Sequence, residues 1–201
     1  MKQKSAIKYL KLLLTLLVLS SGVVSCTDQN DIVGSDSVNM NVVNYQDFSL
    51  SADTVGLDTN VSGTIFVMGD NDKPDELRVQ IIAWVEIDST DWAGVEFAIP
   101  HGWEVSGIVS DYPQGYPAPD EYTTSWQTED SESEWHIKVD IGSSKYNTDI
   151  TRGGKGTVFI ELKPLYPEQK LPDSIDILAG VGSEGDMGAY PCYQIINVPL
   201  N

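Results

Sequence analysis

Apolar and polar residues alternate with a period of two along the central part of this chain. In the segment 77–86 one side is wholly apolar, and its members are Val79, Ile81, Ala83 and Val85. The opposite side is mixed and carries Arg78, Gln80, Ile82, Trp84 and Glu86. Because successive side chains of an extended chain point to opposite faces, this pattern predicts a β-strand with one face buried.

Two more strands are predicted directly after the first. The segment 94–99 places Val95, Phe97 and Ile99 on one face, and the Pro-His-Gly sequence at 100–102 ends it. The segment 103–110 is apolar but is interrupted at Ser106 and Gly107. That interruption predicts either a β-bulge or a close approach of another backbone. Connections of about six residues or fewer favour antiparallel strands over crossover helices.

Similar extended segments recur through the rest of the chain, between clusters of Gly, Pro, Asn and Asp. They are 45–51, 61–68, 122–127, 134–141, 156–163, 174–180 and 193–198. No segment of this region has the pattern of a long amphipathic helix. The sequence therefore predicts an all-β fold, an antiparallel β-sandwich of about nine to ten strands. Alternation alone leaves open whether the topology is jelly-roll or immunoglobulin-like.

The amino-terminal region has the pattern of an export signal. Four lysines precede an apolar run at 12–19, and small residues then lead to Cys26. The apolar run is too short for a helix that spans a membrane, so residues 1–25 are predicted to be a signal peptide.

The residues before Cys26 resemble the lipobox of bacterial lipoproteins, with Val23, Val24 and Ser25 at its three positions. The resemblance implies cleavage before Cys26 and attachment of lipid to its sulfur and to the new amino terminus. The alternative is an ordinary signal peptide followed by a chance cysteine. Because Thr27 stands where some lipoproteins carry a retention aspartate, the resemblance favours the outer membrane or the cell surface of a bacterial envelope.

The predicted domain organisation follows from these two regions. Residues 26–44 are polar with scattered valines and are interpreted as the lipidated terminus and a flexible tether, and residues 45–201 as the β-sandwich domain. If Cys26 is lipidated, Cys192 is the one remaining cysteine, which is more often a buried small apolar residue than a reactive centre.

The net charge of the chain limits the kinds of molecule that it can bind. The 201-residue chain has 30 acidic and 12 basic residues and a net charge of −18. Loss of the four signal lysines lowers this charge to −22. Such a charge opposes binding to nucleic acids and to anionic membrane surfaces. It permits cations, basic proteins or neutral sugars as ligands; the alternative is that the charge only maintains solubility.

The order of three glycine-containing segments gives a second resemblance. These segments are VSGTIFV at 61–67, WAGVEFAI at 92–99 and GKGTVFIEL at 154–162. Over about residues 61–182 their arrangement resembles that of cohesin-like and carbohydrate-binding-module-like β-sandwiches. The resemblance implies a module that binds carbohydrate or protein.

The segment 111–126 is the predicted ligand-binding region. It is the longest stretch without strand character, and among its prolines it carries Tyr112, Tyr116, Tyr122 and Trp126. Rigid loops that carry aromatic rings present them to sugars or proteins at a low entropic cost. The alternative is that these rings cover the end of the sandwich.

A second candidate site is acidic. Within 69–76 the side chains able to provide oxygen ligands are Asp70, Asp72, Asp75 and Glu76. Calcium takes six to eight such oxygens, so this segment is a candidate calcium site, although it lacks the EF-hand pattern. The alternative is a solvated acidic turn.

No motif specific to a reaction is present. His101 and His136 are the two histidines, and neither belongs to a zinc-binding helix pattern. The sequence therefore predicts a non-catalytic, membrane-anchored surface lipoprotein with a cohesin-like binding module. The alternative function is a structural component of an envelope protein assembly, without a small ligand.

Overall fold

The computed structural model describes residues 41–70, 73–115, 119–129, 132–143, 153–184 and 188–201. These residues belong to one compact unit, 39–201. Its ten strands are β1 Val42–Ser51, β2 Asn60–Asp70, β3 Lys73–Ile87, β4 Val95–Pro100, β5 Trp103–Ser110, β6 Thr123–Gln127, β7 Trp135–Ile141, β8 Gly154–Pro164, β9 Ser174–Glu184 and β10 Gly188–Pro199. Short 3-10 turns lie at η1 Asp53–Val55 and η2 Pro119–Tyr122. No helix within the described residues is long and apolar enough to cross a membrane.

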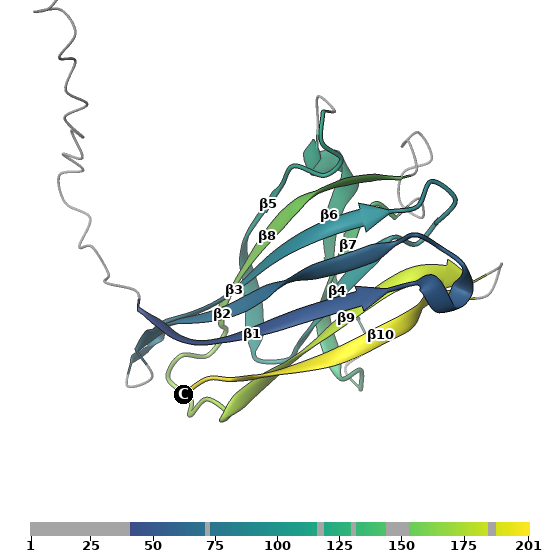
Figure 1. The fold of residues 1–201 in the computed structure, drawn as a ribbon. Helices are drawn as coiled ribbons and strands as arrows, with labels where there is room; N and C mark the ends of the chain where they lie inside the picture. Colours follow the sequence, from purple (N-terminus) through teal and green to yellow (C-terminus); the bar gives the residue numbers. More distant parts are fainter. Residues whose placement is uncertain (1–40, 71–72, 116–118, 130–131, 144–152, 185–187) are drawn as a thin grey trace, which may run out of the picture. The chain divides into compact units, whose positions relative to one another are not determined.

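The strands form two five-stranded sheets. Sheet A has the order β1-β2-β3-β8-β5 and sheet B the order β10-β9-β4-β7-β6. Every pairing within them is antiparallel. Figure 1 shows the two sheets as two layers. The predicted all-β antiparallel sandwich is therefore confirmed, and its strand count matches.

Consecutive strands in the centre of the chain do not pair with each other. β3 lies in sheet A, β4 in sheet B and β5 in sheet A again. The short connections at 88–94 and 101–102 therefore cross between the layers instead of closing hairpins. β4 pairs with β7 and β9, and its residues from Val95 to Ile99 are all buried.

The core lies between the two sheets. The apolar face predicted for β3 is there, since Val79, Ile81, Ala83 and Val85 are each at most 1% exposed. The ring of Phe48 from β1 meets that of Phe97 from β4 edge-to-face, with centroids 5.8 Å apart. Each fully buried Val, Ile or Phe side chain of this core stabilises the fold by about 1.5–3 kcal/mol. Alternation along the strands thus explains why two sheets form and pack face to face.

The interruption in β5 is a β-bulge. The register between β5 and β8 shifts between Val105 and Gly107, which leaves Ser106 as the extra residue. A Cβ added at Gly107 would meet no atom within 4 Å, so no other backbone approaches closely there. Of the two alternatives predicted from sequence, the bulge is the one observed.

Candidate functional site

The outer face of sheet A carries apolar side chains at positions that alternation directs to solvent. Their inward neighbours Ile65, Ile81 and Ile160 are fully buried, so the residues between them face outward. One row across the sheet is Asp47, Thr64, Ile82, Phe159 and Val109. Trp84 lies two residues from Ile82 on the same face.

Four of these residues form what we call the apolar strip: Ile82, Trp84, Phe159 and Val109. Exposure is 41% for Ile82, 38% for Trp84 and 66% for Val109, and Phe159 between them is half-buried. Directly opposed residues on neighbouring strands have Cβ atoms about 5 Å apart, so the strip is continuous. A contiguous exposed apolar patch is typical of an interaction surface.

Two carboxylates on the same face are held by neutral donors. Glu161 accepts hydrogen bonds from Gln80 Nε2 at 2.9 Å and from Ser106 Oγ at 2.9 Å. Asp47 Oδ1 accepts one from Thr64 Oγ1 at 2.6 Å. The nearby Lys163 Nζ is paired with Glu104 at 2.9 Å instead. The apolar strip is therefore accompanied by fixed negative charges whose hydrogen-bond donors are uncharged.

The outer face of sheet B is organised differently, around buried polar contacts. Tyr190 donates its hydroxyl to Asp140 Oδ1 at 2.6 Å, and Trp126 Nε1 donates to Asp140 Oδ2 at 2.8 Å. Lys138 Nζ lies 3.1 Å from Glu96 Oε2 and 5.5 Å from the Trp126 ring centroid. These groups satisfy one another, so the carboxylates here hold the sheet surface together.

Tyr190 is placed by a distorted stretch of β10. The register with β9 shifts between Ala189 and Cys192, and Tyr190 adopts φ 59°, in the left-handed region. Such a conformation costs about 1 kcal/mol for a residue with a side chain. Burial, followed by the charge of Asp140, raises the pKa of Tyr190, so its hydroxyl remains a donor.

Glu96 gives a prediction on pH dependence. Burial raises the pKa of its carboxyl above the ordinary value of 4.5, Lys138 opposes this shift and Asp140 adds to it. The folded state therefore holds the Glu96 proton more tightly than the unfolded state. The resulting stability is complete below the unfolded pKa and is lost as pH rises through the folded pKa. Denaturant titrations should show Glu96→Gln gaining stability relative to the wild type as pH rises above about 4.5. A difference that stays constant with pH would contradict this account.

The predicted aromatic site is not brought together as one exposed group. Tyr112 is fully buried, because its ring packs in the core beside Gly142 and Gly154, and so it does not present itself to a ligand. Tyr122 is half-buried against the core. Trp126 lies on the outer face of sheet B, half-buried and bonded to Asp140. Tyr116 lies outside the described residues.

The acidic segment is the tip of the β2–β3 hairpin, where Asp70 pairs with Lys73. Asp72 lies outside the described residues, as do the side chains of Asp70 and Asp75, and Glu76 is half-buried. Within the described part of the chain, no three His, Cys, Asp or Glu side chains are placed to hold a metal ion. Calcium binding here remains a prediction, as does lipid attachment at Cys26, which also lies outside the described residues.

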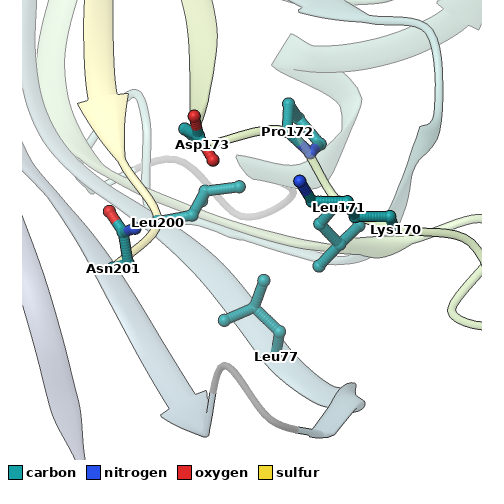
Figure 2. A pocket seen from close by; sticks show the side chains of 7 residues that line it. All are labelled: Leu77, Lys170, Leu171, Pro172, Asp173, Leu200 and Asn201. Atoms are coloured by element: carbon teal, nitrogen blue, oxygen red, sulfur yellow. The ribbon is translucent and has the colours of Figure 1, made fainter.

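A small pocket lies at one end of the sandwich. It has a volume of about 210 Å³ and is lined by Leu77, Lys170, Leu171, Pro172, Asp173, Leu200 and Asn201. Figure 2 shows the three leucine side chains pointing toward one another from separate parts of the chain. Ligand pockets have volumes of about 300–1,000 Å³, so this one is smaller than most. Its apolar floor is a continuation of the core, since Leu77 and Leu200 belong to it.

The apolar strip was missed by reasoning from sequence, although part of its signal was present. Ile82 and Trp84 stand among polar residues on the outward side of β3. Phe159 likewise alternates with the buried Val158 and Ile160. Apolar residues on the solvent-facing side of a strand, where polar residues are the rule, indicate such a surface in the sequence.

The fold and this face define an antiparallel β-sandwich with an exposed apolar sheet surface. No family model matches the chain, and no curated protein matches it. The function is therefore inferred from the site alone.

Proposed function

We propose that this chain is a non-catalytic, lipid-anchored surface lipoprotein whose β-sandwich binds a ligand through the outer face of sheet A. The signal-like residues before Cys26 support the anchor and a place in the bacterial envelope. The observation that carries the binding role is the apolar strip, in which Val109 is 66% exposed and Ile82 is 41% exposed.

Exposure of the strip favours binding over a purely structural role. Fully burying a Val or Ile side chain contributes about 1.5–3 kcal/mol, and at these partly exposed positions the isolated domain forgoes part of that free energy. A ligand that covers the strip recovers this free energy. Both a carbohydrate, through the Trp84 ring and the polar side chains around it, and a protein fit the proposed module, whereas the net charge of −18 opposes nucleic acid.

Binding can be tested with a matched pair of variants in the compact unit 39–201. Ile82→Asp changes the strip, and Ile195→Asp changes a residue of similar exposure, 49%, on the outer face of sheet B. On glycan arrays and on isolated bacterial envelopes, we expect Ile82→Asp to weaken binding about tenfold or more and Ile195→Asp to leave it unchanged. Equal unfolding midpoints would show that both variants are folded. Equal binding by both variants, or no binding by the wild type, would overturn the proposal.

The anchor has its own test. Cells expressing the full chain are labelled with radioactive palmitate, and the label is expected in the wild type and in Cys192→Ala but not in Cys26→Ala. Cys192 is the matched control because it is the other cysteine of the chain. Label that persists in Cys26→Ala would rule out this attachment site.

The alternative function, a structural component of an envelope assembly, is favoured by a different observation. β5 and β6 are the last strands of their sheets, and residues of both line one groove of about 290 Å³ that includes Val105, Trp126 and Ile137. Open strand edges are sites at which other chains add strands. Loss of envelope partners in Ser125→Lys but not in Ile82→Asp would favour this function over the first.

A further inference from the structure

We infer that the outer face of sheet A docks a basic protein, which covers the apolar strip with apolar side chains and places Lys or Arg side chains on Asp47 and Glu161. The inference rests on the proposed function and names the class of ligand.

The chemistry of the strip favours protein over sugar. Val109 and Ile82 are among its most exposed members, at 66% and 41%. Their aliphatic side chains offer neither a flat ring for stacking against a sugar nor a hydrogen-bonding group. Their natural complement is another apolar side chain, packed as in the centre of a protein interface.

The charges beside the strip favour a basic partner. The donors to Glu161 are an amide and a hydroxyl, from Gln80 and Ser106, and the donor to Asp47 is the hydroxyl of Thr64. These neutral donors orient the carboxylates and leave the negative charge in place. The two residues are three strands apart in sheet A, roughly 15 Å, with Asp47 on β1 and Glu161 on β8, two residues from Phe159 of the strip. The net charge of −18 would also steer a basic protein toward the domain.

The size of the face fits a protein partner, and charge favours a different protein over a second copy of this chain. Five strands about 4.8 Å apart and the nine residues of β3 that pair with β8, 79–87, give a face of roughly 650 Å². A standard interface buries about 800 Å² per partner, so this face accommodates most of one. A second copy carries the same net charge of −18, so two copies repel each other, whereas a basic protein is attracted.

Site-specific crosslinking in the native bacterium tests this inference on the full chain. The photo-crosslinker p-benzoylphenylalanine replaces Val109 in one strain and Tyr193 in another; Tyr193, on β10, is 64% exposed and serves as the matched control. We expect a protein adduct from position 109 and none from position 193. Mass spectrometry should place Lys or Arg residues in the crosslinked peptide of the partner.

The charges are tested in the same strain with the conservative pair Asp47→Asn and Glu161→Gln. We expect the adduct to fall about fivefold, and to fall similarly for the wild type in 0.5 M NaCl. An adduct of twice the mass of the chain, an adduct insensitive to both changes, or no adduct at position 109 would overturn the inference. If Ile82→Asp weakens binding to a glycan in that case, the proposed function stands while the protein ligand is ruled out.

Discussion

Gly63→Ala is expected to remove about 3 kcal/mol or more of folding stability. A Cβ at position 63 would lie 2.1 Å from the carbonyl oxygen of Ile82 and 2.9 Å from Cα of Ala83. Both are backbone atoms of β3, which is held on its other side by β8. The strand therefore cannot move away without breaking a second ladder. Urea denaturation of the compact unit measures the loss.

The matched control for this prediction is Gly107→Ala in the β5 bulge. A Cβ there would meet no atom within 4 Å, so the expected change is within about 0.5 kcal/mol. Similar losses in the two variants would show that the general backbone effect of replacing glycine, and not the close contact between β2 and β3, is responsible.

Asp91→Ala is expected to destabilise the domain by about 3–5 kcal/mol. The Asp91 side chain is fully buried and accepts hydrogen bonds from Thr59 Oγ1 at 2.6 Å, from Ser183 Oγ at 2.8 Å and from the backbone N–H of Ala93 at 3.0 Å. Its removal leaves three donors in the interior without this acceptor. Thermal and urea unfolding provide the measurement.

The position of Asp91 explains the size of this effect. It lies in the connection that crosses from β3 in sheet A to β4 in sheet B, while Thr59 precedes β2 and Ser183 belongs to β9. The carboxylate therefore ties together segments from both layers. Asp91→Asn keeps the shape and one acceptor oxygen, so a loss of about 1–2 kcal/mol is expected. A loss as large as that of Asp91→Ala would contradict a role based on the number of acceptor oxygens.

Substitutions on the two faces of β3 in sheet A are expected to have different effects. Val79 and Ile81 face the core, and substitutions there create cavities. Ile82 faces outward, so Ile82→Asp is expected to change ligand binding with little effect on stability. This separation makes the binding test interpretable, because affinity and folding are altered independently.

Much of the fold was predictable from local pattern. About nine to ten strands and the buried face of β3 were expected from alternation, and a bulge near Gly107 was one of the two alternatives that glycine placement left open. These features depend on residues close together in the chain, because the direction of a strand side chain is set by its own backbone. The signal peptide, the lipid on Cys26, the tether and the calcium site remain predictions.

The site required contacts between distant residues. Ile82, Phe159 and Val109 become neighbours because β8 lies between β3 and β5, an order that no local pattern specifies. Tyr112, a predicted ligand-binding candidate, is instead buried in the core. Alternation states which residues of a strand share a side, but the pairing of strands depends on the packing of the whole sandwich. The sequence therefore predicts that each of these residues faces outward from its own strand. Only the pairing of the strands makes them neighbours and so forms the apolar strip.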